Sequence, residues 1–180
     1  MAEVMPGRYT ARIDGDFVVF LIGMRINRPL RVRKWVPMAR KMGPMLKALT
    51  EDPASGLLSF EFGWINRGPA VIQYWRSFEH LDRFAKDPGM PHLPAWRWYN
   101  QAIKSSGDVA IWHETYKVHA GEYETIYGNL NRFGLAKAGD HLPASRHAQT
   151  AAARIGATIE DKPAVAPYET PGVSEPTPGT

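Results

Sequence analysis

The 180-residue sequence contains no cysteine, which excludes disulfides, thiolate nucleophiles and cysteine-bound metals. It also lacks the G-x-x-x-x-G-K-[ST] and G-x-G-x-x-G loops that hold nucleotide phosphates, so we do not expect nucleotide-driven chemistry. Neither an H-E-x-x-H zinc motif nor a G-x-S-x-G nucleophile elbow is present. The six histidines are scattered along the chain, and their spacing predicts no metal site.

Long apolar runs are absent as well. The run at residues 17–24 is far shorter than the roughly 20 residues that a membrane-spanning helix needs. The segment before it lacks the basic lead-in and the cleavage site of a signal peptide. We therefore expect a cytoplasmic protein with no membrane partner.

The net charge is +4, and much of the positive charge lies between residues 28 and 47. These cations flank an apolar helical stripe, so we interpret them as the solvated face of a helix. No zinc finger, helix-turn-helix or RNA-binding aromatic motif accompanies them, and we expect no nucleic-acid partner.

Apolar patterning predicts strands and helices in a definite order. The dense β-branched run at 17–26 predicts a buried strand. Apolar side chains three and four residues apart predict a helix over 35–49, which Gly43-Pro44 should kink or break. Two strands at 57–65 and 70–78 should form a hairpin around N-R-G-P, with the alternating side chains of the first half-buried. Helical segments then flank the interruption D-P-G-M-P-H-L-P, and 109–118 predicts a fourth strand.

The order β-α-β-β-α-β predicts an α+β, ferredoxin-like split βαβ fold with an antiparallel sheet. Helices on one face leave the other face bare, and pairing two such faces predicts a homodimer, a dimeric α/β barrel. We expect an N-terminal arm at 1–15, the domain at 16–142 and a flexible Pro/Ala-rich tail at 143–180. The tail is either a solvated segment or a docking segment.

Candidate catalytic residues surround a pocket expected between the sheet and its helices. They are Asn27 at the end of the first strand, Trp75 in the third, His92 at the helix interruption, and His113 and Glu114 in the fourth. A histidine at a helix break can act as a general base or bind haem iron, although it can equally be a surface residue.

His113 and Glu114 cannot form a close acid–base pair, because neighbouring side chains point to opposite faces of a strand. One should face the pocket and the other the dimer partner. Alternatively, Glu114 pairs across the dimer with Arg25 or Arg76, and His113 is a hydrogen-bonded core histidine. For substrate binding, the candidates are Trp96, Tyr99, Trp112 and Met24.

Several motifs in this order resemble the DUF4188, or af470-like monooxygenase, family of the antibiotic-biosynthesis-monooxygenase-like superfamily. They are V-V-F-L-I-G-M-R-I-N-R-P, V-I-Q-Y-W-R-S, M-P-H-L-P-A-W-R-W-Y-N, I-W-H-E-T-Y-K-V and Y-E-T-I-Y-G-N, within residues 16–142. The resemblance implies a ferredoxin-like homodimer that oxidises a small organic substrate. The family's usual G-N-M-P segment reads G-N-L-N here, at residues 128–131.

The resemblance implies roles for an asparagine, a tryptophan and a histidine, at positions similar to Asn27, Trp75 and His92. Our first hypothesis is therefore a monooxygenase-like enzyme that oxidises a small apolar substrate with dioxygen and no cofactor, with His92 removing a proton and Asn27 holding the oxyanion or peroxide. A second is a haem enzyme of the same fold, a haem monooxygenase or similar to an aldoxime dehydratase, with His92 or His113 as axial ligand. A third is a non-catalytic small-molecule binder or partner-docking dimer.

Overall fold

The computed structural model describes residues 3–89, 92–104, 106–144, 148–159, 162–163, 165–168 and 170–172, apart from the side chains at 92, 95 and 102. Contacts divide the chain into two compact units. One is Phe17–Lys117, the ferredoxin-like unit, and the other combines Met1–Asp16 with Val118–Thr180, the second unit.

The ferredoxin-like unit has the predicted order of elements. These are β2 (Phe17–Ile26), α1 (Val32–Glu51), a 3-10 turn (Pro53–Ser55), β3 (Leu57–Ile65), β4 (Gly68–Trp75), α2 (Phe78–Lys86), α3 (His92–Ala102) and β5 (Val109–Val118). The four strands form one sheet in the order β3-β4-β2-β5, and β4 is antiparallel to both of its neighbours. This is the ferredoxin-like topology, so the predicted α+β fold class is confirmed. The single chain forms an open sheet and not a closed barrel.

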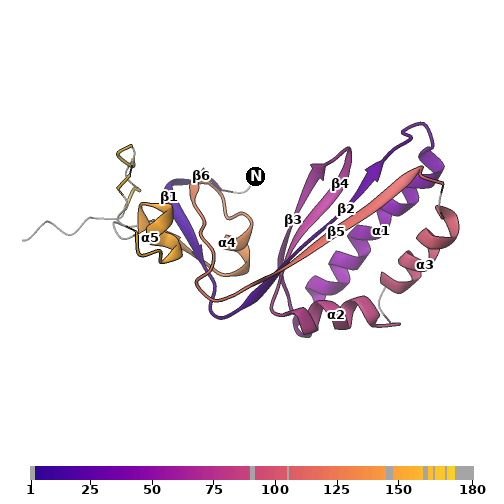
Figure 1. Ribbon diagram of the computed structural model, residues 1–180, viewed down its shortest axis with the longest axis horizontal. Coiled ribbons are helices and arrows are strands. Elements are labelled where there is room, and N and C mark those ends of the chain that lie inside the picture. Colours follow the sequence, from indigo (N-terminus) through magenta and orange to yellow (C-terminus); the bar gives the residue numbers. More distant parts are fainter. Residues whose placement is uncertain are drawn as a thin grey trace, which may run out of the picture. The chain divides into compact units, whose positions relative to one another are not determined.

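All three long helices of this unit lie on one face of the sheet (Figure 1). Alternate residues of each strand therefore face the helices. One buried cluster joins Val18 and Trp75 of the sheet to Leu49 of α1 and Leu81 of α2. A second cluster, at the other end of the sheet, joins Met24, Ile26, Ile103 and Val109.

Helix α1 is not broken at Gly43-Pro44, where we predicted a kink or a break. Both Pro37 and Pro44 lie inside the helix. A proline removes the N–H that would bond the carbonyl four residues earlier, here Arg33 and Arg40. Gly43, Pro44, Arg33 and Arg40 are all exposed, so water can satisfy those carbonyls while the opposite face of the helix stays packed.

The distal half of β3 is less covered than its alternating pattern predicts. Phe62 and Trp64 point to the helix side of the sheet but are 60% and 68% exposed. Because β3 is an edge strand, the helices cover the central strands and leave its far end open. The hairpin that follows turns at Asn66 and Arg67, both with positive φ (52° and 64°), as a two-residue type I′ turn requires.

The second unit contains a small sheet that the sequence did not predict. Strand β1 (Met5–Arg12) lies between β6 (Tyr127–Leu130) and β7 (Asp140–Pro143) and is antiparallel to both. Short helices α4 (Leu135–Ala138) and α5 (Ala151–Ile155) belong to the same unit. The residues proposed as an arm and part of the proposed tail thus take part in regular structure.

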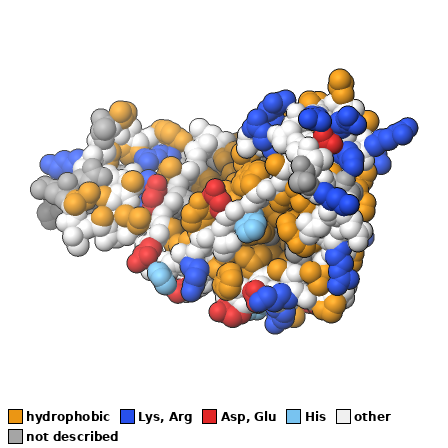
Figure 2. All heavy atoms as spheres, turned by 45° about the vertical axis from the view of Figure 1, so that its right-hand side comes forward, with side chains coloured by type: hydrophobic (Ala, Val, Ile, Leu, Met, Phe, Trp, Pro, Cys, Tyr) orange, Lys and Arg blue, Asp and Glu red, His pale blue; other side chains and the backbone are white. Residues whose placement is uncertain are grey.

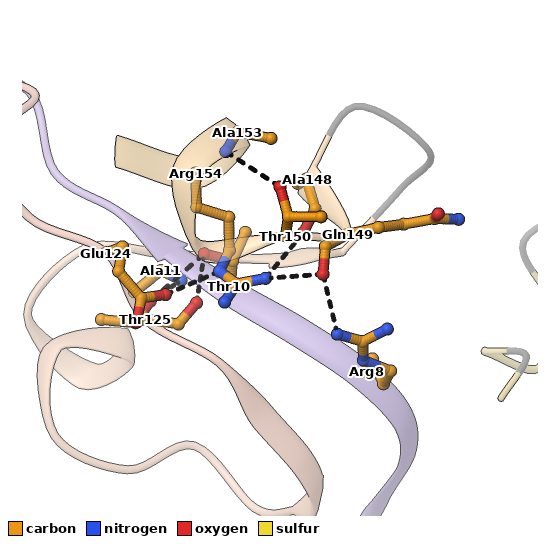
Figure 3. Close-up of polar contacts among 10 residues, drawn as sticks. All are labelled: Arg8, Thr10, Ala11, Glu124, Thr125, Ala148, Gln149, Thr150, Ala153 and Arg154. Carbon is orange, nitrogen blue, oxygen red and sulfur yellow. Dashed lines mark hydrogen bonds and ion pairs between the residues drawn. The ribbon is translucent and has the colours of Figure 1, made fainter. Parts of the chain in front are cut away.

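Arg154 of α5 holds the end of this unit together (Figure 3). Its side chain is 6% exposed, forms an ion pair with Glu124 at 2.7 Å, and donates to the carbonyls of Ala148 and Gln149. Arg8 of β1 donates to the same Gln149 carbonyl at 3.1 Å. These partners offset the desolvation cost of the buried Arg154 charge. Through them, α5 is held against the sheet.

The imidazole ring of His141 is buried in the second unit. Its ring stacks on Tyr9 at 4.6 Å and meets Tyr127 edge-on at 5.6 Å, and neither ring nitrogen has a partner in the described part of the chain. Burial, and secondarily the positive charge of Arg132, lower the pKa of His141 below its ordinary 6.5. The folded unit therefore favours the neutral imidazole.

We expect the second unit to lose stability as the pH falls below about 6.5, because the unfolded chain then binds a proton that the folded unit resists. The loss should be complete below the lowered pKa of the folded state. His141→Phe, which keeps the aromatic stack, should flatten this acid-side decline in thermal unfolding temperature. His113→Phe, which removes an exposed imidazole from the other unit, should retain the decline. An unchanged profile for His141→Phe would show that another group causes it.

Candidate active site

An apolar cavity of about 80 Å³ lies between α1 and the sheet in the ferredoxin-like unit. Met38, Ala39 and Met42 of α1 form one wall. The sheet side is formed by Ile22, Gly23, Met24, Phe62, Pro69, Val71 and Ile111. The opening lies on the β3 side, because Phe62 is largely exposed. Such a lining favours a small apolar ligand.

A second cavity of about 50 Å³ continues from the first along α1. The two share Ile22 and Met42 in their walls. The inner cavity also reaches Phe20 and the buried Gln73, whose amide oxygen accepts a hydrogen bond from Trp75 Nε1 at 2.9 Å. Methionine side chains are flexible, so movement of Met42 can join the two spaces.

A wider depression of about 450 Å³ at the C-terminal end of α1 offers a weaker site. Its polar side chains are engaged with their surroundings: Arg83 donates to the Ala54 carbonyl at 2.8 Å, and Asp52 accepts from the Ala54 N–H at 2.9 Å. His80 Nδ1 lies 2.9 Å from Ser77 Oγ. These bonds fix the junction between α1 and α2. The polar residues of the depression therefore have a structural role that needs no ligand.

His113 lies on the helix-covered face of β5, the face expected for a pocket residue. It shares this face with Val109 of the buried cluster and with Ile111 of the cavity wall. Its ring is 5.7 Å from that of Phe20, which lines the inner cavity. Its side chain is exposed, so the imidazole stands at the edge of the sheet in contact with the cavity wall and with water.

Asn27 does not reach the cavity. Its amide oxygen accepts from Arg25 Nε at 2.9 Å, and its amide nitrogen donates to the Gly107 carbonyl at 3.0 Å. Its backbone N–H binds the Asp108 carbonyl at 3.1 Å. Asn27 therefore joins the end of β2 to the start of β5, where both of its polar atoms serve the fold.

Trp75 is a core residue in this structure. It is 0% exposed, and its ring packs 5.7 Å from that of Phe84. Its position at the end of β4 opposite Val18 places it at the other end of the sheet from Asn27. The structure therefore does not bring Asn27 and Trp75 together around one ligand.

Glu114 lies on the bare face of the sheet, opposite to His113. It accepts a hydrogen bond from Tyr116 two residues later, and this bond raises the pKa of the Tyr116 hydroxyl. Trp112 shares the face and lies over Gly23, where a Cβ atom would come within 2.6 Å of the indole ring. The alternation that separated His113 from Glu114 is thus observed.

The remaining substrate-binding candidates occupy different positions. Met24 is buried and lines the cavity. Tyr99 packs beside Met24 in the second cluster, and its hydroxyl donates to the Val109 carbonyl at 3.4 Å. Trp96 stacks on Tyr99 at 5.5 Å and is partly exposed, outside the cavity lining. His92 begins α3, but its side chain lies outside the described residues.

The sequence reasoning missed the α1 wall of the cavity. It recognised Met38 and Met42 only as part of a helical stripe, and it did not consider Ala39. The signal was present, because two methionines and an alanine within one turn leave a shallow, deformable surface facing the sheet. Within the described residues, no group of three or more His, Asp or Glu side chains could hold a metal ion.

Residues 17–135 match the sequence family described as Monooxygenase af470-like. The chain belongs to this family. It is 32% identical over 162 residues to the curated Monooxygenase af470 of Aspergillus fumigatus, which covers 76% of this chain. The match spans 56% of that relative's length, so the chain corresponds to about half of it.

Solved structures with a similar fold include SnoaB of Streptomyces nogalater, a cofactor-independent oxygenase, at a TM-score of 0.40 and 12% identity over 56% of this chain and 91% of that one. An aldoxime dehydratase in complex with butyraldoxime aligns at a TM-score of 0.46 and 14% identity, over 74% of this chain and 42% of that one. Neither likeness carries a functional argument at this TM-score.

Proposed function

We propose that the chain is a monooxygenase that oxidises a small apolar organic substrate bound between α1 and the sheet. Membership of the Monooxygenase af470-like family supports the reaction type. The choice of site rests on the cavity lined by Met38 and Met42, because this cavity combines an apolar lining with an opening at Phe62. A flat or aliphatic substrate is favoured there over a charged one, because nearly all of the lining is hydrocarbon or thioether.

We propose His113 as the group that removes a proton from the substrate. Its ring touches Phe20 of the cavity wall and is also open to solvent, so a proton can leave to water. His92 is the alternative base. It begins α3, which lies on the same face of the sheet as His113 (Figure 1).

The reaction balances without an external reductant if the substrate carries an activated CH₂ group. Removal of a proton gives a carbanion, and O₂ adds to that carbon. Loss of water then leaves a carbonyl: R₂CH₂ + O₂ → R₂C=O + H₂O. Both electron pairs that reduce dioxygen come from the two C–H bonds of the substrate.

Haem fits this cavity poorly. The volume of about 80 Å³ is far smaller than a porphyrin ring, so the cavity can take only a much smaller molecule. We therefore derive no step through haem.

We expect oxygen uptake with one or more small apolar compounds that carry an activated CH₂ group, or with electron-rich phenols whose keto tautomer carries one. Met42→Trp should abolish it by filling the cavity, while His113→Ala should lower kcat about a hundredfold or more and leave KM nearly unchanged. His119→Ala, an exposed histidine of the second unit paired with Asp16, is the matched control and should retain full turnover. Turnover that survives Met42→Trp would contradict the site, and loss of turnover in the control would point to a general folding defect.

We further propose that the ferredoxin-like unit forms a homodimer through its bare sheet face. Val19, Leu21, Ile72, Tyr74 and Trp112 point to this face, on which no helix of the unit lies (Figure 1). Such an apolar sheet face needs cover, and a second copy provides it with isologous contacts.

Leu21→Arg should therefore convert a dimer into a monomer, because a cation at the centre of an apolar interface would lose its water. Sedimentation equilibrium measures the mass directly. Leu142→Arg, at an exposed leucine of the second unit, should leave the dimer intact. A wild-type protein that sediments as a monomer at high concentration would refute the proposed interface.

A further inference from the structure

The end of the ferredoxin-like unit where β2 stops and β5 starts carries a dense group of cations, here called the basic end. Its members are Arg25, Arg28, Arg31, Arg33, Lys34, Arg67 and Lys104. Figure 2 shows Lys and Arg side chains gathered at this end, with hydrophobic side chains protruding among them. Asp108 is the acidic residue beside them, and it is buried under Arg28 at 3.3 Å.

Three loops form the basic end, and hydrogen bonds hold them together. The Ile26 N–H binds the Arg67 carbonyl at 3.2 Å, which joins the β3–β4 turn to the end of β2. The backbone N–H groups of Asn27 and Arg28 both bind the Asp108 carbonyl, which joins the loop before β5. The cations therefore sit on a fixed surface rather than on independent mobile loops.

Large apolar side chains protrude from the same surface. Leu30 is 96% exposed at the tip of a turn closed by the bond from Arg31 N–H to the Arg28 carbonyl at 3.0 Å. Trp35 Nε1 holds the base of this turn through the Pro29 carbonyl at 2.9 Å. Val32, Trp64 and Ile65 are also exposed, and the latter two directly precede the Asn66–Arg67 turn.

Helix stability does not explain this arrangement. The first turn of α1 contains no acidic residue and carries Arg33 and Lys34. Cations near the N-terminus of a helix oppose its dipole and slightly destabilise it. Folding does not explain Leu30 either, since an almost fully exposed leucine buries no surface within the unit.

We propose that the basic end docks on an anionic lipid surface, with Leu30 and Trp64 entering the headgroup region. Lys and Arg side chains supply attraction to acidic headgroups, and aliphatic and Trp side chains supply the apolar contact at the interface. Nucleic acid fits less well, because a phosphodiester backbone would attract the cations but would make no favourable contact with an exposed leucine. No helix among the described residues is long and apolar enough to cross a bilayer, so the contact is peripheral.

Docking on a lipid surface would bring the cavity opening close to the lipid. Phe62, which lines the cavity opening, lies two residues before Trp64 on the same face of β3. An apolar substrate dissolved in lipid would thus enter close to the docked surface. This use of the docking rests on the proposed function, whereas the docking itself does not require turnover.

Sedimentation with vesicles tests the docking on the full chain. The wild type should bind phosphatidylcholine vesicles that contain phosphatidylserine, should bind pure phosphatidylcholine vesicles far less, and should be released by salt. Leu30→Asp should abolish binding. Val165→Asp, at an exposed valine of the second unit, is the matched control and should bind as the wild type does.

The charge contribution is tested by Arg31→Glu combined with Arg33→Glu, which should raise the lipid concentration needed for half-binding at least about thirty-fold. Arg40→Glu, an exposed arginine further along α1, should have a much smaller effect. Unchanged melting temperatures would show that the variants are folded.

The proposal is overturned if phosphatidylserine does not increase vesicle binding by the wild type. It is also overturned if Leu30→Asp binds normally and duplex DNA displaces the protein from vesicles, since that result indicates a general polyanion contact. Oxygen uptake by Leu30→Asp with a water-soluble phenol separates failure of docking from failure of the proposed enzyme.

Discussion

The packing of α1 across the helix-covered face of the sheet is the interaction on which the rest of the ferredoxin-like unit depends. Leu46 and Leu49 are each 2% exposed in this contact, and burying one such side chain contributes about 2–3 kcal/mol. Loss of either contact would therefore remove a substantial fraction of the roughly 5–15 kcal/mol net stability of a typical domain. The C-terminal half of α1 thus anchors the helix, and its middle, with Met38 and Met42, is free to be loosely packed.

The same placement of α1 creates both the cavity and the exposed edge beside it. The helices cover β2 and β4 but not the distal half of β3, so Phe62 and Trp64 stay in water although they point to the helix side. An interior void normally destabilises a fold. Flexible methionines reduce that cost because they can move into an empty space and withdraw when a ligand enters. The candidate ligand site and the exposed apolar edge both follow from one incompletely covered sheet.

The sequence was sufficient for the ferredoxin-like unit, because each strand and helix there carries a strong periodic signal. It was insufficient for the small sheet of the second unit, where β6 and β7 have four residues each and pair with β1 more than a hundred residues away in sequence. Strand alternation correctly separated His113 from Glu114. It could not place Asn27 and Trp75, since Asn27 bonds to Gly107 across 80 residues and Trp75 packs against helix residues such as Leu81 and Phe84, contacts that no local pattern encodes. The cavity was not predicted because methionines at helical spacing indicate core packing, and only the position of the facing sheet shows that a space remains beside them.

The most direct test of the central claim is a spectrum of the protein labelled with ¹³C at its methionine methyl groups, recorded while a small phenolic ligand is added. The sequence contains seven methionines, and Met24, Met38 and Met42 line the cavity while Met5 belongs to the second unit. The account predicts saturable shifts of the three cavity signals, largest for Met38 and Met42, with the Met5 signal unchanged. Shifts confined to methionines that line neither the outer nor the inner cavity, or no saturable shift with any apolar ligand, would contradict a binding site between α1 and the sheet.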